Sequence, residues 1–290
     1  MRVIDYSDAT PRPRTVAVGT FDGVHVGHRD VIAGSDTVLT FEPHPVAVLA
    51  PAHMPKILTP LAIKADIIAS LGVDELIVVA FNAAFAARTA EQFVQEVLVE
   101  RLAARTVSVG ENFRFGAGAK GDAALLAADG RFETRVVALR EIDGEIVSSS
   151  QIRSLIAAGE VARAALLLGD PFELRAAVVS GDRRGRELGF PTANLVPPTG
   201  VVCPGHGVYA CLANGLPAAV NVGVRPTFET GRGELIEAYL LDFAGDLYGQ
   251  ELRLQFLERL RGERRFETVE ALIEEMYRDV ERTRAVCARV

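Results

Sequence analysis

The stretch Arg14–His28, RTVAVGTFDGVHVGH, decides how the first half of the chain folds. Its first six residues alternate and end in glycine, which predicts a buried strand that runs into a loop. Residues 27–32 (GHRDVI) indicate the start of a short helix. His25 and His28 would then project from a strand-to-helix turn, beside free backbone N–H groups that favour anionic oxygens. The stretch therefore predicts a phosphate site, and the sequence has no G-x-x-x-x-G-K-[ST] motif to serve instead.

The composition favours a cytoplasmic enzyme with one large or two modest domains. The chain has 290 residues, 49% of them hydrophobic, which is ample for real cores. Its net charge of −7 argues against a general affinity for nucleic-acid backbone, so we expect small-molecule partners. The three cysteines have neither metal-ligand nor disulfide spacing, and residues 1–14 lack the apolar core of a signal peptide. The uncharged stretch between Glu187 and Arg225 contains five prolines, so we expect no membrane span there.

Up to about Leu168, short apolar runs alternate with helical patterns. This alternation predicts a doubly wound, Rossmann-like parallel sheet with helices on both faces. One helix should begin near Pro60 with Thr59 as its N-cap, and another should carry a capping box formed by Thr89 and Gln92. Ligands of such sheets bind beyond the carboxyl ends of the strands, where the histidine turn should lie.

After residues 169–171 the pattern changes to strand-like pieces separated by turn-rich stretches. This pattern predicts a small antiparallel β-barrel, closed by a helix at about residues 268–288. We therefore expect an α/β protein with two domains, residues 1–170 and residues 171–290. The charged run 258–267 (ERLRGERRFE) predicts a solvated approach to the last helix.

Three further motifs occur in the first half, and each is weak by itself. They are TFEPHP at residues 40–45, GENFRFG at residues 110–116 and SSSQIR at residues 148–153. A loop asparagine is usually a turn former, and a serine run is usually a helix cap. Together with the HxGH pattern, and in this order, they resemble the nucleotidyltransferase module of the bacterial bifunctional riboflavin kinase/FAD synthetase family. The resemblance implies in-line attack of the FMN phosphate on the α-phosphorus of ATP.

The same resemblance implies roles for individual residues. His25 and His28 would be catalytic and hold the ATP phosphates, while Asp22 would help to order the loop and a metal-bound nucleotide. Asn112 would contact the flavin. The ATP ligands implied for this half are Gly19, Phe21, Asp22, His25, His28, Ser149, Ser150 and Arg153.

The second half carries its own constellation. GRELGFPTANL at residues 185–195, NVGVRPTF at 221–228 and EAYLLDF at 237–243 resemble the riboflavin kinase domain of that family. Phosphorylating a primary hydroxyl requires a metal on the ATP phosphates, a polar cradle and a carboxylate that accepts the hydroxyl proton. The resemblance therefore implies a kinase site in this half.

By this resemblance Glu237 would be the general base, and Thr192 and Asn194 would hold Mg²⁺ at the kinase site. Both reactions would need Mg²⁺. Residues 181–189 would form a mobile flap, and Arg225 would contact flavin or phosphate. The ATP ligands implied for this half are Gly181, Arg186, Gly189, Pro191, Thr192 and Asn194. Tyr239 stands where the family commonly has histidine.

We therefore interpret the sequence as that of a cytoplasmic enzyme that converts riboflavin to FMN and FMN to FAD. Only eight residues (RDVIAGSD) separate His28 from the next strand, whereas a parallel crossover usually needs a dozen or so. This leaves open a riboflavin kinase whose first domain binds nucleotide with weak or no adenylyl transfer. A non-catalytic flavin-binding protein and adenylyl transfer to another acceptor are further alternatives, and the oligomeric state stays open.

Overall fold

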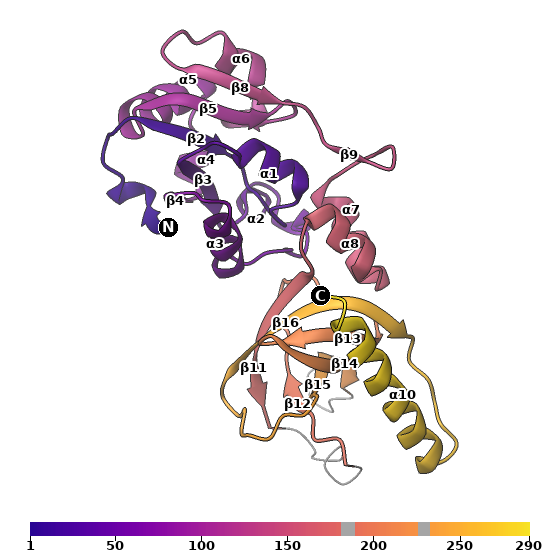
Figure 1. The fold of residues 1–290 in the computed structure, drawn as a ribbon. Helices are drawn as coiled ribbons and strands as arrows, with labels where there is room; N and C mark the ends of the chain where they lie inside the picture. The colour runs from indigo at the N-terminus through magenta and orange to yellow at the C-terminus, as the bar shows by residue number, and fades with distance from the viewer. Residues whose placement is uncertain (181–188, 226–232) are drawn as a thin grey trace. The chain divides into compact units, whose positions relative to one another are not determined.

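The computed structural model describes residues 1–180, 189–225 and 233–290. They form two compact units, Met1–Ser149 and Ser150–Val290 (Figure 1). Two of the predicted kinase ligands, Gly181 and Arg186, lie outside the described residues, as does the side chain of Arg225.

The first unit is built on a parallel sheet of six strands, as predicted. The order across the sheet is β1 (Arg2–Asp5), β4 (Glu75–Ala80), β3 (Thr37–Glu42), β2 (Arg14–Val18), β5 (Ala104–Gly110) and β8 (Glu133–Val137). Five of these strands match the apolar runs of the sequence, whereas the short edge strand β1 was not expected. The crossover from β2 to β3 holds both strands in parallel register, with Val18 opposite Leu39, despite its short helix.

Helices cover both faces of this sheet, because alternate strand residues point to opposite sides. On one face Ala17, Val38 and Leu76 pack against α1 (Val26–Ile32) and α3 (Leu61–Ser70). On the other, residues such as Val16 and Leu39 pack with further helices, among them α4 (Ala83–Ala86), the π-helix η3 (Phe93–Arg101) and α6 (Ala123–Ala127). The unit also contains η1 (Tyr6–Asp8), α2 (Pro45–Leu49), η2 (Pro51–His53), α5 (Ala90–Gln92), β6 (Arg114–Phe115), η4 (Ala117–Ala119), β7 (Gly121–Asp122), β9 (Glu141–Ile142) and β10 (Glu145–Ile146).

One predicted helix cap is confirmed and one is wrong. Thr89 and Gln92 form the reciprocal capping box at the start of α5. The N-cap of α3 is Pro60 rather than Thr59. The Thr59 hydroxyl is engaged elsewhere, since it accepts a hydrogen bond from the backbone N–H of Gly23 at 2.8 Å.

The second unit begins at Ser150, within α7 (Ser149–Ala158). It continues through α8 (Val161–Leu168) into the predicted barrel. In the described part of the chain, six antiparallel strands close the barrel. Their order is β11 (Phe172–Val179), β12 (Ala193–Leu195), β15 (Gly233–Leu240), β14 (Leu216–Arg225), β13 (Gly207–Ala213) and β16 (Glu251–Arg261). The predicted terminal helix is α10 (Val269–Cys287), which lies alongside β13 and β14 (Figure 1).

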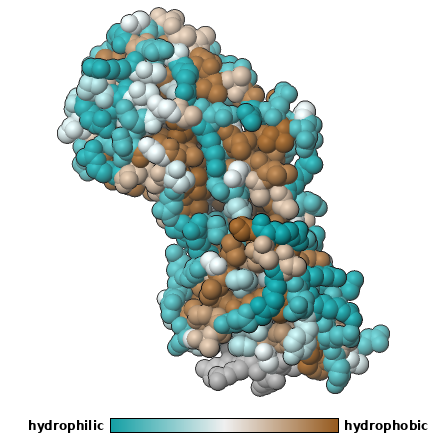
Figure 2. All heavy atoms as spheres, viewed as in Figure 1, coloured by the Kyte–Doolittle hydropathy of each residue, from teal (hydrophilic) through white to brown (hydrophobic). Residues whose placement is uncertain are grey.

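Alternation along the barrel strands separates a packed interior from a polar outer wall. On β15, Ile236, Ala238 and Leu240 are buried, whereas Glu237 and Tyr239 are half-buried. In Figure 2, polar residues cover much of the visible face of each unit, and apolar residues form separate patches. Among the described residues, no helix is long and apolar enough to cross a membrane.

Candidate active sites

The loop between β2 and α1 has an unusual backbone that buried side chains hold in place. Phe21 and Val24 have φ angles of 51° and 40°, and both side chains are buried. Positive φ costs of order 1–3 kcal/mol, and for a β-branched residue such as valine it is a genuine outlier. A β-carbon at Gly19 would lie 2.9 Å from the Phe21 ring, so a larger residue there would force this buried ring to shift. The loop is therefore shaped by the packing of its own apolar residues.

Asp22 ties this loop to the segment before α3. Its side chain is buried, and Oδ1 accepts hydrogen bonds from the backbone N–H groups of Leu58 at 2.9 Å and Thr59 at 3.1 Å. The Asp22 carbonyl accepts a bond from the Ser149 hydroxyl at 2.8 Å. Asp22 thus orders the loop from both its side chain and its backbone.

The two predicted histidines form a stacked pair at the start of α1. Their ring centroids are 3.5 Å apart with an angle of 18° between the planes. His25 caps the helix, since its Nδ1 accepts from the His28 backbone N–H at 3.2 Å. This bond requires the His25 proton to be on Nε2, which is then free to donate. The Nδ1 atom of His28 is buried without a hydrogen-bond partner among the described residues.

Burial keeps both imidazoles neutral at pH 7. Desolvation lowers the pKa of His25 to about 4, against an opposing effect of the Asp22 carboxylate. Desolvation also holds the pKa of His28 well below its usual range, helped by His25 and by the Lys64 ammonium. Neutral imidazoles donate hydrogen bonds but bring no net charge to a triphosphate.

A large apolar cavity opens beside the same loop. Its volume is about 450 Å³, and Thr20 of the histidine loop contributes to its wall. Six phenylalanines line it: Phe41, Phe81, Phe85, Phe93, Phe113 and Phe115. Arg88 adds a cation, which lies 4.6 Å from the centroid of the Phe85 ring. Such a cavity fits a flat aromatic ligand.

The other residues predicted for this half occupy two places. Asn112 is exposed in the turn after β5, next to Phe113 and Arg114 of the cavity wall. Ser150 and Arg153 belong to the second unit, where the Arg153 guanidinium donates to the Ser150 hydroxyl at 3.4 Å.

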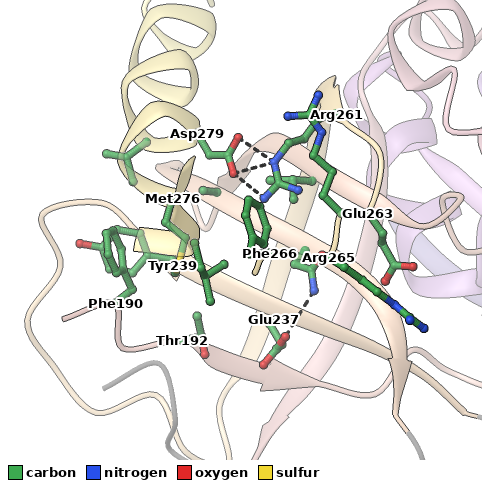
Figure 3. A pocket seen from close by; sticks show the side chains of 16 residues that line it. Phe190, Thr192, Glu237, Tyr239, Arg261, Glu263, Arg265, Phe266, Met276 and Asp279 are labelled. Atoms are coloured by element: carbon green, nitrogen blue, oxygen red, sulfur yellow. Dashed lines mark hydrogen bonds and ion pairs between the residues drawn. The ribbon is translucent and has the colours of Figure 1, made fainter. Parts of the chain in front are cut away.

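The second unit has a cavity of about 680 Å³ between the outer wall of the barrel and α10 (Figure 3). Thr192 and Glu237 line it from the barrel, and Met276 and Asp279 line it from the helix. Figure 3 shows Thr192 and Glu237 at the same end of this cavity. The structure therefore brings together two residues that stand 45 positions apart in the sequence.

Two asparagines flank the Glu237 carboxylate on the neighbouring strands. Asn194 on β12 and Asn221 on β14 both lie directly opposite Glu237 in the strand register. Directly opposed residues share a face of the sheet, with β-carbons about 5 Å apart. Asn221 donates from Nδ2 to Glu237 Oε2 at 3.3 Å, the bond drawn in Figure 3. Asn221 belongs to a motif quoted above but was not predicted as a site residue.

A second cavity of about 480 Å³ adjoins the first at Thr192. Pro191, Thr192 and Asn194 line it together with the segment 243–248. Thr192 lines both cavities, so a ligand in each would meet at this residue. Gly189 is not among the lining residues of either cavity, and has φ of 84° next to the buried Phe190.

The charged run 258–267 is largely exposed and leads to α10, as predicted, but its first four residues belong to β16 and several of its side chains have partners in the second unit. Arg261 ends β16 and forms a two-pronged ion pair with Asp279 of α10, at 2.8–3.2 Å. The residues that follow, Glu263, Arg264, Arg265 and Phe266, line the larger cavity. Sequence reasoning missed them because their acids and bases alternate as on any exposed segment, and Asp279 lies 18 positions away.

Sequence reasoning also missed Lys64, which lies on α3 and is only 3% exposed. Its ammonium donates to the Thr20 carbonyl of the histidine loop at 2.9 Å. A signal was present, since Lys64 precedes the buried Ile68 by four residues and therefore shares its helix face.

Comparison with known proteins agrees with both halves of this architecture. A sequence model of FAD synthetase matches residues 7–151, and one of riboflavin kinase matches residues 168–287. The chain is 38% identical to the bifunctional riboflavin kinase/FMN adenylyltransferase of Escherichia coli K12, over 94% of this chain and 92% of that one. For the Bacillus subtilis protein of the same description, the values are 37%, 91% and 89%.

A solved structure is similar over nearly the whole chain. It is described as a macrolide-efflux protein from Streptococcus pneumoniae and has a TM-score of 0.89 at 30% identity. The match covers 97% of this chain and 98% of that one.

Proposed function

Because the chain belongs to the bifunctional riboflavin kinase/FMN adenylyltransferase family, we propose that each unit carries one of the two reactions at the sites described above. The enzyme phosphorylates riboflavin with ATP to FMN, and it adenylylates FMN with ATP to FAD and pyrophosphate. We assign the adenylyltransferase to residues 1–170 and the kinase to residues 171–290. The substrates are small molecules, and we place the enzyme in the cytoplasm.

In the kinase, riboflavin occupies the larger cavity and ATP the smaller one. The observation that carries this assignment is that Thr192 lines both cavities, with the Glu237 carboxylate beside it. Glu237 accepts the proton of the 5'-hydroxyl of riboflavin, whose oxygen attacks the γ-phosphorus of ATP, and ADP leaves. Asn221 holds the carboxylate in place through its hydrogen bond at 3.3 Å. We keep Arg225, Gly181, Arg186 and Gly189 as proposed ligands.

Mg²⁺ fits the donors at the meeting point of these cavities. The Thr192 hydroxyl, the Asn194 amide and the Glu237 carboxylate are oxygen donors, the type that Mg²⁺ prefers. Asn194 and Glu237 are direct neighbours across β12 and β15. We propose that Thr192 and Asn194 hold the ion, which neutralises charge on the phosphates when bound.

In the adenylyltransferase, the ATP phosphates lie against the loop that carries Asp22, His25 and His28. His25 has a free Nε2 donor, because its Nδ1 accepts from the helix. His28 has a buried Nδ1 that no described residue satisfies. These groups orient the phosphates while the FMN phosphate attacks the α-phosphorus and pyrophosphate leaves with the electron pair of the broken bond. We keep Gly19, Phe21, Ser149, Ser150 and Arg153 as proposed ATP ligands.

The isoalloxazine ring of FMN fits the aromatic cavity of the first unit. Its wall is built from phenylalanines, and Thr20 connects it to the histidine loop. Asn112 stands next to the wall residue Phe113, where an amide could bond to the polar edge of the flavin. We propose that the flavin phosphate points toward the loop that holds ATP.

A product assay tests the assignment of both activities. Purified enzyme is incubated with riboflavin and ATP, with and without Mg²⁺, and the flavins are separated by chromatography. We expect FMN to appear first and FAD to follow, each only with the metal. FMN without FAD would instead support the kinase with an inactive first domain. Bound flavin with no ATP consumption would contradict both activities.

A further inference from the structure

Lys64 is a buried cation in the unit that carries the histidine loop. Its side chain is 3% exposed, and lysine is almost never buried to this degree unless it is paired. The ammonium donates to the Thr20 carbonyl at 2.9 Å and lies 3.5 Å from the Thr40 hydroxyl. Thr40 in turn donates to the same carbonyl at 3.0 Å. Both partners lie at the carboxyl ends of adjacent strands, β2 and β3.

These partners accept hydrogen bonds from the ammonium but do not neutralise its charge. Both are uncharged oxygens, whereas buried charges are usually paired with a counter-charge. Burial lowers the pKa of Lys64, and the carboxylates of Asp22 and Glu42 raise it in opposition. A bound anion would raise it further, because a nearby opposite charge favours the charged form.

The cation acts on the histidine pair. Desolvation of the ring lowers the pKa of His28, and His25 and the Lys64 charge add to this effect. Both imidazoles are therefore neutral donors that bring no positive charge to the ATP phosphates, whereas Lys64 is a cation held against the same loop. Arg29 of α1 is turned to the loop backbone, where it donates to the Val24 carbonyl at 3.1 Å.

We propose that Lys64 is a positioning residue of adenylyl transfer: its ammonium, held on the Thr20 carbonyl, fixes the histidine loop and stabilises the negative charge of the ATP phosphates and of departing pyrophosphate. The reaction balances as before, since the FMN phosphate oxygen forms a bond to the α-phosphorus and pyrophosphate takes the electron pair of the broken bond. Lys64 transfers no proton in this step. The inference rests on the proposed assignment of adenylyl transfer to this loop.

Two variants separate the effect of the Lys64 charge from that of the hydrogen bonds to the Thr20 carbonyl. Lys64→Met removes the ammonium and keeps the length and much of the volume of the side chain. Thr40→Val removes a hydroxyl bond to the same carbonyl and leaves the cation. The full-length enzyme is supplied with FMN and ATP, and kcat and KM for ATP are measured for FAD formation. The rate of FMN formation from riboflavin serves as the internal control for the second unit.

We expect Lys64→Met to lower kcat of FAD formation about 100-fold, the size typical of losing one fixed electrostatic group. Thr40→Val should stay within a few-fold of the unaltered enzyme. NMR titration of isotope-labelled histidines should show a higher pKa for His28 in Lys64→Met, with Asp22, Glu42 and His25 unchanged around it. This titration reports whether the Lys64 charge reaches His28; a tether that acts only through its hydrogen bond to Thr20 would leave the pKa of His28 unchanged.

Two outcomes would overturn the proposal. One is full FAD formation by Lys64→Met. The other is an equal loss in both variants with no change in the histidine titration, which would show that the Lys64 charge has no effect of its own on the reaction. His28→Ala distinguishes this failure from that of the proposed function. If His28→Ala keeps full FAD formation, the reaction is not at this loop, whatever Lys64 does.

Discussion

Asn221 donates a hydrogen bond from Nδ2 to Glu237 Oε2 at 3.3 Å, across two strands on which the residues are directly opposed. The bond leaves the other carboxylate oxygen available to a substrate in the cavity between the barrel and α10. A general base needs this combination of a fixed orientation and a free oxygen.

Glu237→Gln keeps the shape and the polarity of the side chain but cannot accept a proton. We expect FMN formation to fall by about 10²–10⁴-fold, the usual contribution of a general base. FAD formation from supplied FMN should not change, because it takes place in the other unit. Both rates are measured by chromatography of the products. An unaltered rate of FMN formation would contradict the assignment of Glu237 as the base.

Asn221→Asp places a second carboxylate opposite Glu237. Carboxylates that share a site retain a proton to higher pH than a lone one. The pH at which the kinase reaches half of its maximal rate should therefore rise by about one unit or more. Asn221→Leu is the matched control, because it removes the hydrogen bond without adding charge. Asn221→Leu should slow the enzyme and shift the profile less than Asn221→Asp does, and the same profile for both variants would contradict the prediction.

His28→Ala removes one member of the stacked imidazole pair. We expect FAD formation from FMN and ATP to fall by at least about 100-fold, since a fixed donor to the phosphates is lost. Conversion of riboflavin to FMN should continue at the normal rate. A comparable loss of both activities would show that the variant is misfolded, which circular dichroism would detect independently.

Phe113→Ala opens the aromatic wall of the cavity in the first unit. Phe113 stacks on Phe115 with centroids 5.6 Å apart. We expect the KM for FMN to rise about 10-fold in FAD formation, because stacking of one phenylalanine ring on the flavin ring contributes of order 1 kcal/mol. Riboflavin kinetics in the second unit should be unaffected. An unchanged KM for FMN would exclude this cavity as the flavin site.

The lowered pKa of His25 makes the stability of the first unit depend on pH. The unfolded chain binds a proton on this imidazole below pH 6.5, whereas the folded protein does so only near pH 4. The contribution of the neutral His25 imidazole to the free energy of unfolding is therefore fully present above pH 6.5, and it is lost as the pH falls toward 4. The loss amounts to about 3 kcal/mol for His25 alone.

His25→Asn should weaken this dependence, since asparagine also caps helices but does not titrate here. The measurement is hydrogen exchange of the β2 backbone, residues 14–18, corrected for the intrinsic effect of pH on exchange. Because β2 belongs to the first unit, this measurement reports on the stability of that unit alone. Equal dependence on pH in both proteins would contradict the assignment of the shift to His25.

The sequence predicts the sheet and the barrel because strand and helix periods are local properties. It does not reveal β1, which is four residues long and mainly exposed, or β12, which has three residues and pairs only with distant strands. The stacking of His25 on His28 follows from their spacing on one turn of helix. The burial of Lys64 and the pairing of Arg261 with Asp279 depend on elements far apart in the chain, so only the folded structure reveals them.

The position of α10 has a consequence for synthesis on the ribosome. This helix forms one wall of the larger cavity, yet it follows all of the described barrel strands in chain order. Units generally fold in the order in which they are made. The histidine loop and its sheet can therefore be complete in the nascent chain while the larger cavity of the second unit still lacks a wall. With the proposed assignment of the two sites, the capacity to make FAD should mature before the capacity to make FMN.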